Sequence, residues 1–447
     1  MTERDTKRTN RLAVLLLIGA FLALTAPLLV ASKSGKSEMK DQDLYHLPVI
    51  ESFAEQLPSP DLTSYDAATA PGYHLLMALV HRATGGSMAA MVGITWLFGL
   101  GLIAAVAWYA SRVAGLTRGA LLALPLACSS YTVGGATALS TDNIAVMFAA
   151  LAVGGAVFLT WSARTSVFLG VSALLAVGVR QIFVWSIAPV GLVGLLASPL
   201  ARFAPVSLVR ADEPKRWRNA VLGAAAAALP VALLGVLILL WDGLVPASAN
   251  IEIAKHQNGL NPATFAYALA LLGVFAPPFV VLAGFRLSDV RSKLLWALVA
   301  AALVCALAVP TSHQMKARAY GWFWQTLAQK APDVMDRSIV ITLFAPVGAA
   351  CAALLWCSVR RAGRRREGII LSLTMLGALL AQSLNSMAWQ KYFEQFTLVA
   401  LAWTAALALS AQKERLPKYR WALLFALAGA QGLFSAAKFF KQAFVDA

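Results

Sequence analysis

Long apolar stretches separated by short polar ones account for most of the chain. Thirteen such stretches lie near 12–31, 90–110, 118–133, 143–161, 167–179, 182–199, 219–241, 264–285, 293–310, 338–358, 368–387, 396–411 and 420–436. About 20 apolar residues in a helix are long enough to cross the hydrocarbon core of a bilayer. The pattern therefore predicts an all-α polytopic membrane protein with about thirteen transmembrane helices.

Composition agrees with this pattern. The chain has 447 residues, of which 13% are charged, and its mean hydropathy is +0.70. A soluble domain would expose far more charge. The net charge of +16 has a topological explanation: with the N-terminus in the cytoplasm, 24 of the 37 Lys and Arg residues and 7 of the 21 acidic residues fall in cytoplasmic loops. This is the positive-inside pattern, so the basic charge implies no nucleic-acid partner.

The N-terminal segment is expected to be a membrane anchor, and the cysteines are expected to be core residues. A basic start followed by an apolar run also describes a signal peptide, but a run of about twenty residues is longer than a signal h-region. We expect a retained first anchor. The four cysteines all fall within predicted transmembrane stretches, so we expect small core residues and no disulfide: Cys128, Cys305, Cys351 and Cys357.

Acidic side chains gather in the first predicted outer loop, 32–88, at Asp41, Asp43, Glu51, Glu55 and Asp66. The apolar spacing across 44–57 predicts an amphipathic helix lying in the membrane interface. On such a helix Asp43 and His46 are three residues apart and share a face. A Pro71-Gly72 turn then precedes a second short helix.

Further polar residues are predicted on the same outer face. Asp142 opens a helix, either as a cap or as part of a site. Arg180 and Gln181 end an apolar helix, and an arginine so close to hydrocarbon usually has an anionic partner. Lys255 with His256 and, later, Lys391 lie in the outer loops 242–265 and 385–396, where they are either solvated or interfacial residues or ligands of an anion.

Carboxylates and cations on one outer face suit a polyprenyl-phosphate sugar. Its tail would lie between helices, its phosphate would accept hydrogen bonds from Arg and Lys, and a carboxylate would take the proton of the attacking hydroxyl. No nucleotide-binding fold is then needed.

Three segments resemble a known family. They read "QDLYHLPV" (42–49), "YDAATAPGYH" (65–74) and "RQIFVW" (180–185), with a weaker likeness at "SANIEIAKHQNG" (248–259). They resemble the GT-C superfamily of integral-membrane glycosyltransferases and, more narrowly, the eukaryotic dolichyl-phosphoglucose α-1,2-glucosyltransferases. The chain departs from that family at Gln42, where the family has Asp, at Asp43, where it has Glu, and at Ile182-Phe183, where it has Thr-Asn.

The resemblance implies a GT-C-type bundle in the bacterial cytoplasmic membrane, with residues 1–260 as the catalytic module and 261–447 completing the donor and acceptor sites. It implies inverting transfer of a hexose, expected to be glucose, from a polyprenyl-phosphate carrier to a lipid-linked or surface glycan on the extracytoplasmic face. The resemblance assigns roles to these residues: Asp43 as base with Asp41 as the alternative, Asp66 as support, Arg180, Lys255 and Lys391 on the phosphate, and Gln181, His256, His46 and Asp142 as further contacts. No cofactor is implied, although Asp41, Asp43 and Asp142 would be the ligands of a divalent metal.

Two alternatives stay open. Another GT-C activity would transfer mannose, arabinose or aminoarabinose to a protein or lipid. A secondary transporter would instead place its key polar residues near the bilayer midplane on broken helices, commonly within repeated halves. The polar residues here cluster at one face and the sequence shows no internal repeat, which favours the enzyme.

Overall fold

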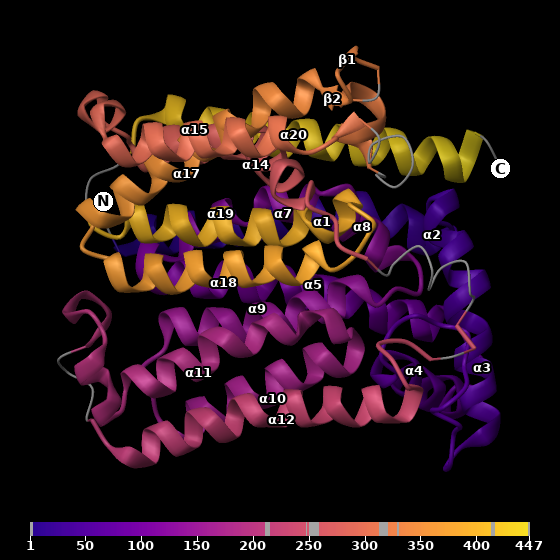
Figure 1. The fold of residues 1–447 in the computed structure, drawn as a ribbon. Helices are drawn as coiled ribbons and strands as arrows, with labels where there is room; N and C mark the ends of the chain where they lie inside the picture. The colour runs from indigo at the N-terminus through magenta and orange to yellow at the C-terminus, as the bar shows by residue number, and fades with distance from the viewer. Residues whose placement is uncertain are drawn as a thin grey trace.

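The computed structural model describes residues 3–210, 215–246, 248–249, 259–312, 321–328, 330–412 and 416–445. Figure 1 shows one bundle of helices running side by side. Within the described residues the only strands are the antiparallel pair β1 (Asp333–Val334) and β2 (Arg337–Ser338). The predicted all-α fold is confirmed.

Each of the thirteen predicted stretches overlaps one or more helices. These are α1 (Glu3–Val30), α5 (Met88–Ala114), α6 (Leu116–Leu122), α7 (Leu124–Cys128), α8 (Ser130–Thr137), α9 (Asp142–Phe158), α10 (Ala163–Val179), η2 (Gln181–Ser186), α11 (Ile187–Leu196), α12 (Trp217–Trp241), α14 (Thr264–Ala283), α15 (Lys293–Ala308), α17 (Ile339–Arg361), α18 (Arg365–Ser383), α19 (Glu394–Leu409) and α20 (Lys418–Phe440). Among the described residues, seven helices are long and apolar enough to cross a membrane, or eight if a bent pair is one span. The protein is an integral membrane protein.

The bent pair corresponds to the predicted stretch 118–133, which is not one straight helix. The axis turns by 71° between Leu116–Cys128 and Ser130–Thr137. Ser129 is in an extended conformation at the break, and its hydroxyl accepts a hydrogen bond from the backbone N–H of Tyr131. A serine that caps a new helix competes with continuation of the old one. The break therefore puts a helix N-terminus inside the bundle.

The first outer loop contains the two predicted short helices, which correspond to α3 (Leu47–Gln56) and α4 (Gly72–Ala83). It also contains two elements that the sequence did not predict, α2 (Lys36–Asp41) and the π-helical turn η1 (Gln42–His46). Figure 1 shows α3 crossing the ends of the long helices. Ile50 and Phe53 of α3 are buried, and the Phe53 ring meets edge-on the ring of Tyr65 in the loop that follows the helix.

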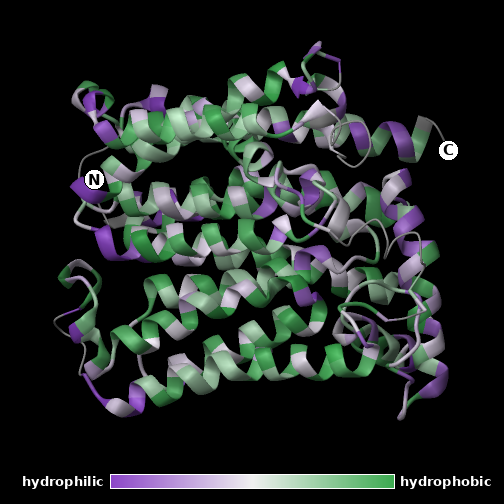
Figure 2. Cartoon of the chain, viewed as in Figure 1, coloured by the Kyte–Doolittle hydropathy of each residue, from purple (hydrophilic) through white to green (hydrophobic). Residues whose placement is uncertain are grey.

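Polar residues concentrate at the two ends of the bundle. Figure 2 shows hydrophilic residues at both ends and largely hydrophobic ones between them. The N-terminus and the 199–210 segment lie at one end, and α2, α3, α4 and the C-terminus lie at the other (Figure 1). All four cysteines are free thiols, with Cys128 and Cys351 buried in the core.

Candidate functional site

Two ion pairs lie at the end of the bundle that carries α2 to α4. Asp41, the last residue of α2, pairs with Lys391 of the turn η7 (Gln390–Tyr392), with 3.3 Å between Oδ2 and Nζ. Asp142, the first residue of α9, pairs with Arg180 directly after α10. Both pairs are partly buried, where screening by solvent is weaker than at a surface. The sequence predicted an anionic partner for Arg180, and the structure provides Asp142.

The ring of Tyr392 joins the two pairs into one cluster. The Arg180 guanidinium carbon lies 5.2 Å from the ring centroid, and the Lys391 ammonium lies 5.7 Å from it. Lys391 also lies 4.5 Å from the ring of Trp389, which stacks on Tyr392. Each contact is within cation–π range. The two cations thus share one aromatic support, which we call the Tyr392 cluster: Asp41, Asp142, Arg180, Lys391 and Tyr392.

His46 lies near this cluster, and its surroundings disfavour the charged imidazolium. Burial, together with the positive charges of Lys391 and Arg180, lowers the pKa of His46 to about 3. Its Nδ1 atom is 3.1 Å from Nε2 of His74, so one ring donates to the other. Burial also lowers the pKa of His74. The imidazole of His46 is therefore available for hydrogen bonding without adding a third positive charge.

Asp43 points elsewhere. It is exposed, and its Oδ1 accepts a hydrogen bond from Gln42 Nε2 at 3.1 Å, whereas His46 turns toward His74. The expected shared face assumed α-helical spacing. The residues form a π-helical turn instead, whose wider i→i+5 spacing changes which side chains lie together.

Gln181 fastens the Asp66 loop to the turn that carries Arg180. Its Oε1 accepts from Ala70 N at 2.9 Å, and its Nε2 donates to the carbonyl oxygens of Ala68 and Leu244 at 3.1 and 2.8 Å. The sequence suggested a substrate contact, but this amide is occupied by backbone groups. Asp66 is exposed in the loop that Gln181 holds.

Two predicted ligands, Lys255 and His256, lie outside the described residues. Within the described residues, no group of three or more His, Cys, Asp or Glu side chains is arranged to hold a metal ion. Asp41, Asp43 and Asp142 therefore do not form the metal site that the sequence left open.

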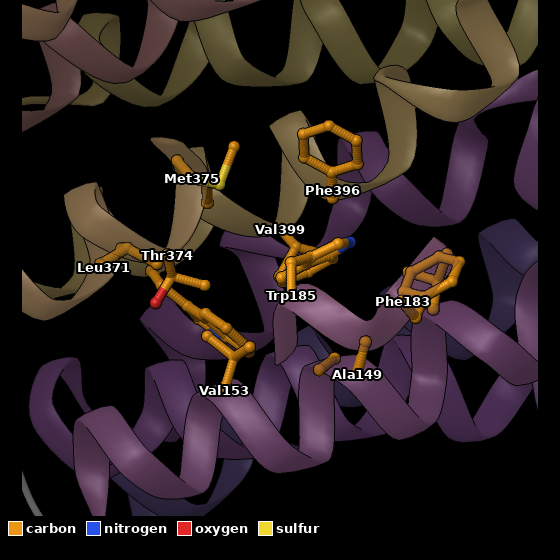
Figure 3. A pocket seen from close by; sticks show the side chains of 13 residues that line it. Ala149, Val153, Phe183, Trp185, Leu371, Thr374, Met375, Phe396 and Val399 are labelled. Atoms are coloured by element: carbon orange, nitrogen blue, oxygen red, sulfur yellow. The ribbon is translucent and has the colours of Figure 1, made fainter. Parts of the chain in front are cut away.

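An apolar pocket begins one helical turn inside the Tyr392 cluster. Its lining includes Val146, Ala149, Phe183, Trp185, Met375 and Phe396, which come from α9, η2, α18 and α19. Figure 3 shows the Trp185 indole between Ala149 and Val153 of α9 on one side and Met375 and Phe396 on the other. The pocket is narrow, with about 20 Å³ open to water-sized molecules. Three of its residues follow site residues closely: Val146 follows Asp142, Phe183 follows Arg180, and Phe396 follows Tyr392.

Tyr392 and Phe396 were not predicted as site residues. "AWQKYFEQF" (388–396) reads equally well as an interfacial aromatic belt, because both functions use rings beside a lysine. In the sequence, only the alternation of aromatic residues with a single lysine could have indicated that Tyr392 and Phe396 belong to a site.

The chemistry available at this site is recognition of an anionic head joined to an apolar tail. Two cations lie about one helical turn from a pocket lined by hydrocarbon and rings. Carboxylates accompany both cations, so a proton acceptor is also at hand.

Comparison with known proteins identifies the fold. No protein-family model matches the sequence, and no curated protein matches it. Among solved structures, ArnT from Cupriavidus metallidurans bound to undecaprenyl phosphate aligns with a TM-score of 0.51 and 14% identity, over 95% of this chain and 64% of that one. The chain has a GT-C fold.

The Archaeoglobus fulgidus oligosaccharyltransferase gives the same result. Its structure tethered with an acceptor peptide aligns at a TM-score of 0.50 and 15% identity, over 95% of this chain and 55% of that one. The archaeal oligosaccharyltransferase AglB from the same organism, in complex with an inhibitory peptide and a dolichol-phosphate, aligns at a TM-score of 0.50 and 15% identity, over 95% of this chain and 56% of that one. The chain spans 55% to 64% of the length of these proteins, and at 14% to 15% identity the likeness concerns the fold alone.

Proposed function

We propose that this protein transfers a sugar from a polyprenyl-phosphate carrier to an acceptor hydroxyl at the membrane surface. One observation carries the proposal: two cations share the Tyr392 ring, and an apolar pocket between helices is lined by Val146, Phe183 and Phe396, about one helical turn along the chain from Asp142, Arg180 and Tyr392. A polyprenyl-phosphate has the matching halves, an anionic head and a hydrocarbon tail. The ArnT structure contains undecaprenyl phosphate and one AglB structure contains dolichol phosphate, which supports the same ligand class here.

Donor binding would exchange partners at the two ion pairs. Phosphate oxygens would compete with Asp41 for Lys391 and with Asp142 for Arg180, because charge-assisted hydrogen bonds to phosphate are strong for both cations. The tail would enter between α9 and α18. The pocket is too narrow for an isoprenoid chain as it stands, so Met375, a flexible side chain, and Phe396 would have to move apart.

The same exchange favours Asp41 as the general base. Once Lys391 turns to the phosphate, the Asp41 carboxylate loses its ion-pair partner 3.3 Å away and can accept a proton. Asp43, exposed two residues later, is the alternative base. Asp66 would support the acceptor from the loop that Gln181 holds in place.

The reaction would be a single displacement with inversion. The base takes the proton of the acceptor hydroxyl as its oxygen bonds to the anomeric carbon. The bond from that carbon to the phosphate oxygen breaks, and its electron pair leaves with the polyprenyl phosphate. Arg180 and Lys391 stabilise the charge that develops on the departing phosphate.

We further propose that the sugar is a hexose, with glucose favoured, and that the acceptor is a lipid-linked or surface glycan. Support comes from the segments at 42–49, 65–74 and 180–185 that resemble dolichyl-phosphoglucose glucosyltransferases. The distribution of basic loops supports a bacterial cytoplasmic membrane with the N-terminus inside and the site outside. Residues 1–260 supply Asp41, Asp142 and Arg180, and 261–447 supply Lys391.

Binding of the carrier tests this proposal directly. Undecaprenyl phosphate should raise the melting temperature of the purified protein in detergent, since a ligand that binds only the fold stabilises it. Arg180→Met and Lys391→Met should each abolish the increase. An equal increase in all three proteins would show that the lipid does not bind at the Tyr392 cluster and would contradict the proposal.

A further inference from the structure

Behind Lys391 and Tyr392 lies a fully buried polar pair, Gln390 and Glu394. Gln390 Nε2 donates to Glu394 Oε2 at 2.5 Å, and Gln390 Oε1 accepts from the backbone N–H of Phe323 at 2.9 Å. Both ends of the Gln390 amide are therefore held. Neither side chain touches the proposed substrate.

Glu394 is in turn held by three other segments. Its Oε1 accepts from Ser129 Oγ at 2.6 Å and from Gln431 Nε2 at 3.4 Å, and its Oε2 also accepts from Trp322 Nε1 at 3.2 Å. Burying a carboxylate is costly unless hydrogen bonds compensate. Here each oxygen has two donors. The Ser129 break in the 116–137 stretch is one of these donors, which gives that break a structural role.

The turn η7 depends on this anchor. It is a three-residue 3-10 turn, closed by Tyr392 N to Trp389 O at 2.9 Å and Phe393 N to Gln390 O at 3.0 Å. Such short turns have few internal bonds to fix their orientation. Of its three side chains, only that of Gln390 is buried, while Lys391 and Tyr392 face the ion pairs. The position of the turn is thus set by the amide of Gln390.

We propose that Gln390, held by Glu394, is a positioning residue that keeps Lys391 and Tyr392 facing Arg180. Its effect on turnover rests on the proposed function, but its effect on the geometry of Lys391 does not. Loss of the amide frees η7 to rotate, which separates Lys391 from Asp41 and takes the Tyr392 ring from under Arg180.

Two matched substitutions isolate this role. Gln390→Met and Gln431→Met each replace a buried glutamine that donates to Glu394 with an apolar residue of similar size. They differ in the oxygen affected, since Gln390 donates to Oε2 and Gln431 to Oε1. Only Gln390 is part of η7, so only its loss should reach Lys391.

The first readout needs no substrate. Lys391 is labelled with an acylating reagent, and its labelling rate is measured by mass spectrometry relative to that of exposed Lys293, the first residue of α15. Gln390→Met should raise the Lys391 rate at least threefold, and Gln431→Met should leave it within twofold of wild type. Equal changes in both variants, or none in either, would overturn the proposal. If wild type transfers no sugar, this result still stands or fails by itself.

The second readout is kinetic. With a polyprenyl-phosphate sugar as donor, Gln390→Met should raise the KM for the donor about tenfold, and Gln431→Met should leave that KM unchanged. A merely structural role would lower the melting temperature of both variants without separating their KM values. If Gln390→Met does not fold, Gln390→Asn replaces it, because the shorter amide cannot reach both Glu394 and the Phe323 N–H.

A conservative change gives the opposite expectation. In Glu394→Gln the carbonyl oxygen can stay with Gln390 and Trp322 while the new NH2 group faces Ser129 and Gln431. Both of those can accept: the hydroxyl rotates, and the Gln431 amide can turn over to present Oε1, which has no hydrogen-bond partner among the described residues. Lys391 labelling should therefore remain within twofold of wild type, and a threefold increase would contradict the assignment.

Discussion

The Nζ atom of Lys391 lies 3.3 Å from Oδ2 of Asp41, although 350 positions separate the two residues. This pair joins the first outer loop to the turn before α19. Together with Asp142 and Arg180 it keeps two cations, each paired with a carboxylate, about one helical turn from an apolar pocket. The two positive and two negative side chains balance each other until an anion competes for the cations.

Removing the charge of Lys391 should weaken donor binding without disturbing the fold. Lys391→Met retains the apolar stem over Trp389 and removes the charge, so we expect donor KM to rise about tenfold or more. The loss corresponds to roughly 1.4 kcal/mol or more of binding free energy. The measurement is donor KM in detergent, with Lys441→Met on the exposed C-terminal segment as the matched control. An unchanged KM for Lys391→Met would remove this residue from the donor site.

Acid should destabilise the protein partly through His46. Its pKa falls from 6.5 in the unfolded chain to about 3 in the fold, so the unfolded chain binds more protons between these pH values. Stability that is present above pH 6.5 is therefore lost as the pH falls toward 3. At pH 5 the free energy of unfolding is lower by about 2 kcal/mol than above pH 6.5, at 1.36 kcal/mol per pKa unit.

The variant His46→Gln lacks this titration. Its melting temperature should fall less than that of wild type between pH 7 and pH 5, while His81→Gln, at the far end of α4, should follow wild type. Parallel melting curves for His46→Gln and wild type would show that His46 is not held neutral by the fold.

Filling the pocket should discriminate between long and short donors. Ala149→Leu adds three carbons to a space with about 20 Å³ open to water-sized molecules, so it should block a polyprenyl tail. We expect donor KM to rise about tenfold for an undecaprenyl carrier and to change little for a carrier of two isoprene units. Leu373→Phe, on the exposed face of α18, is the control. Equal effects of Ala149→Leu on both carriers would place the tail elsewhere.

Gln181 should act on the loop rather than on the substrate. Gln181→Met removes three hydrogen bonds to the backbone of Ala68, Ala70 and Leu244 and frees the loop around Asp66. The expected result is faster limited proteolysis between residues 57 and 71, with the melting temperature lowered by a few degrees. Unchanged proteolysis would show that the loop is held by other contacts.

Periodicity alone predicted most of the helices, because an apolar run of helical length has few alternatives in a membrane protein. It missed the break at Ser129, since one serine in an apolar run is an ordinary residue until a buried partner such as Glu394 is known. It also predicted the residue types of the site better than their pairing. Arg180 needed an anion, but choosing Asp142 rather than Asp41 requires knowing which helix ends meet in space.

The π-helical turn at 42–46 also could not be predicted from the sequence. Helical spacing put Asp43 and His46 on one face, and a π-helical turn separated them. The position of Asp43 in the 42–49 motif predicts it as the base, whereas the ion pair to Lys391 favours Asp41. Contacts between residues hundreds of positions apart decide that choice, and no local pattern encodes them.

The most direct test of the account is sugar transfer by the purified protein. Radiolabelled undecaprenyl-phosphoglucose is incubated with wild type, Asp41→Asn and Asp43→Asn, with a bacterial membrane extract as the acceptor pool, and phosphomannose and phosphoarabinose carriers are run in parallel. We predict that wild type moves label into a new lipid or glycan product and that Asp41→Asn loses at least 100-fold of this activity, on the order expected for a general base. Absence of transfer from every carrier by a folded wild-type protein that binds undecaprenyl phosphate would contradict the enzymatic function proposed for this site.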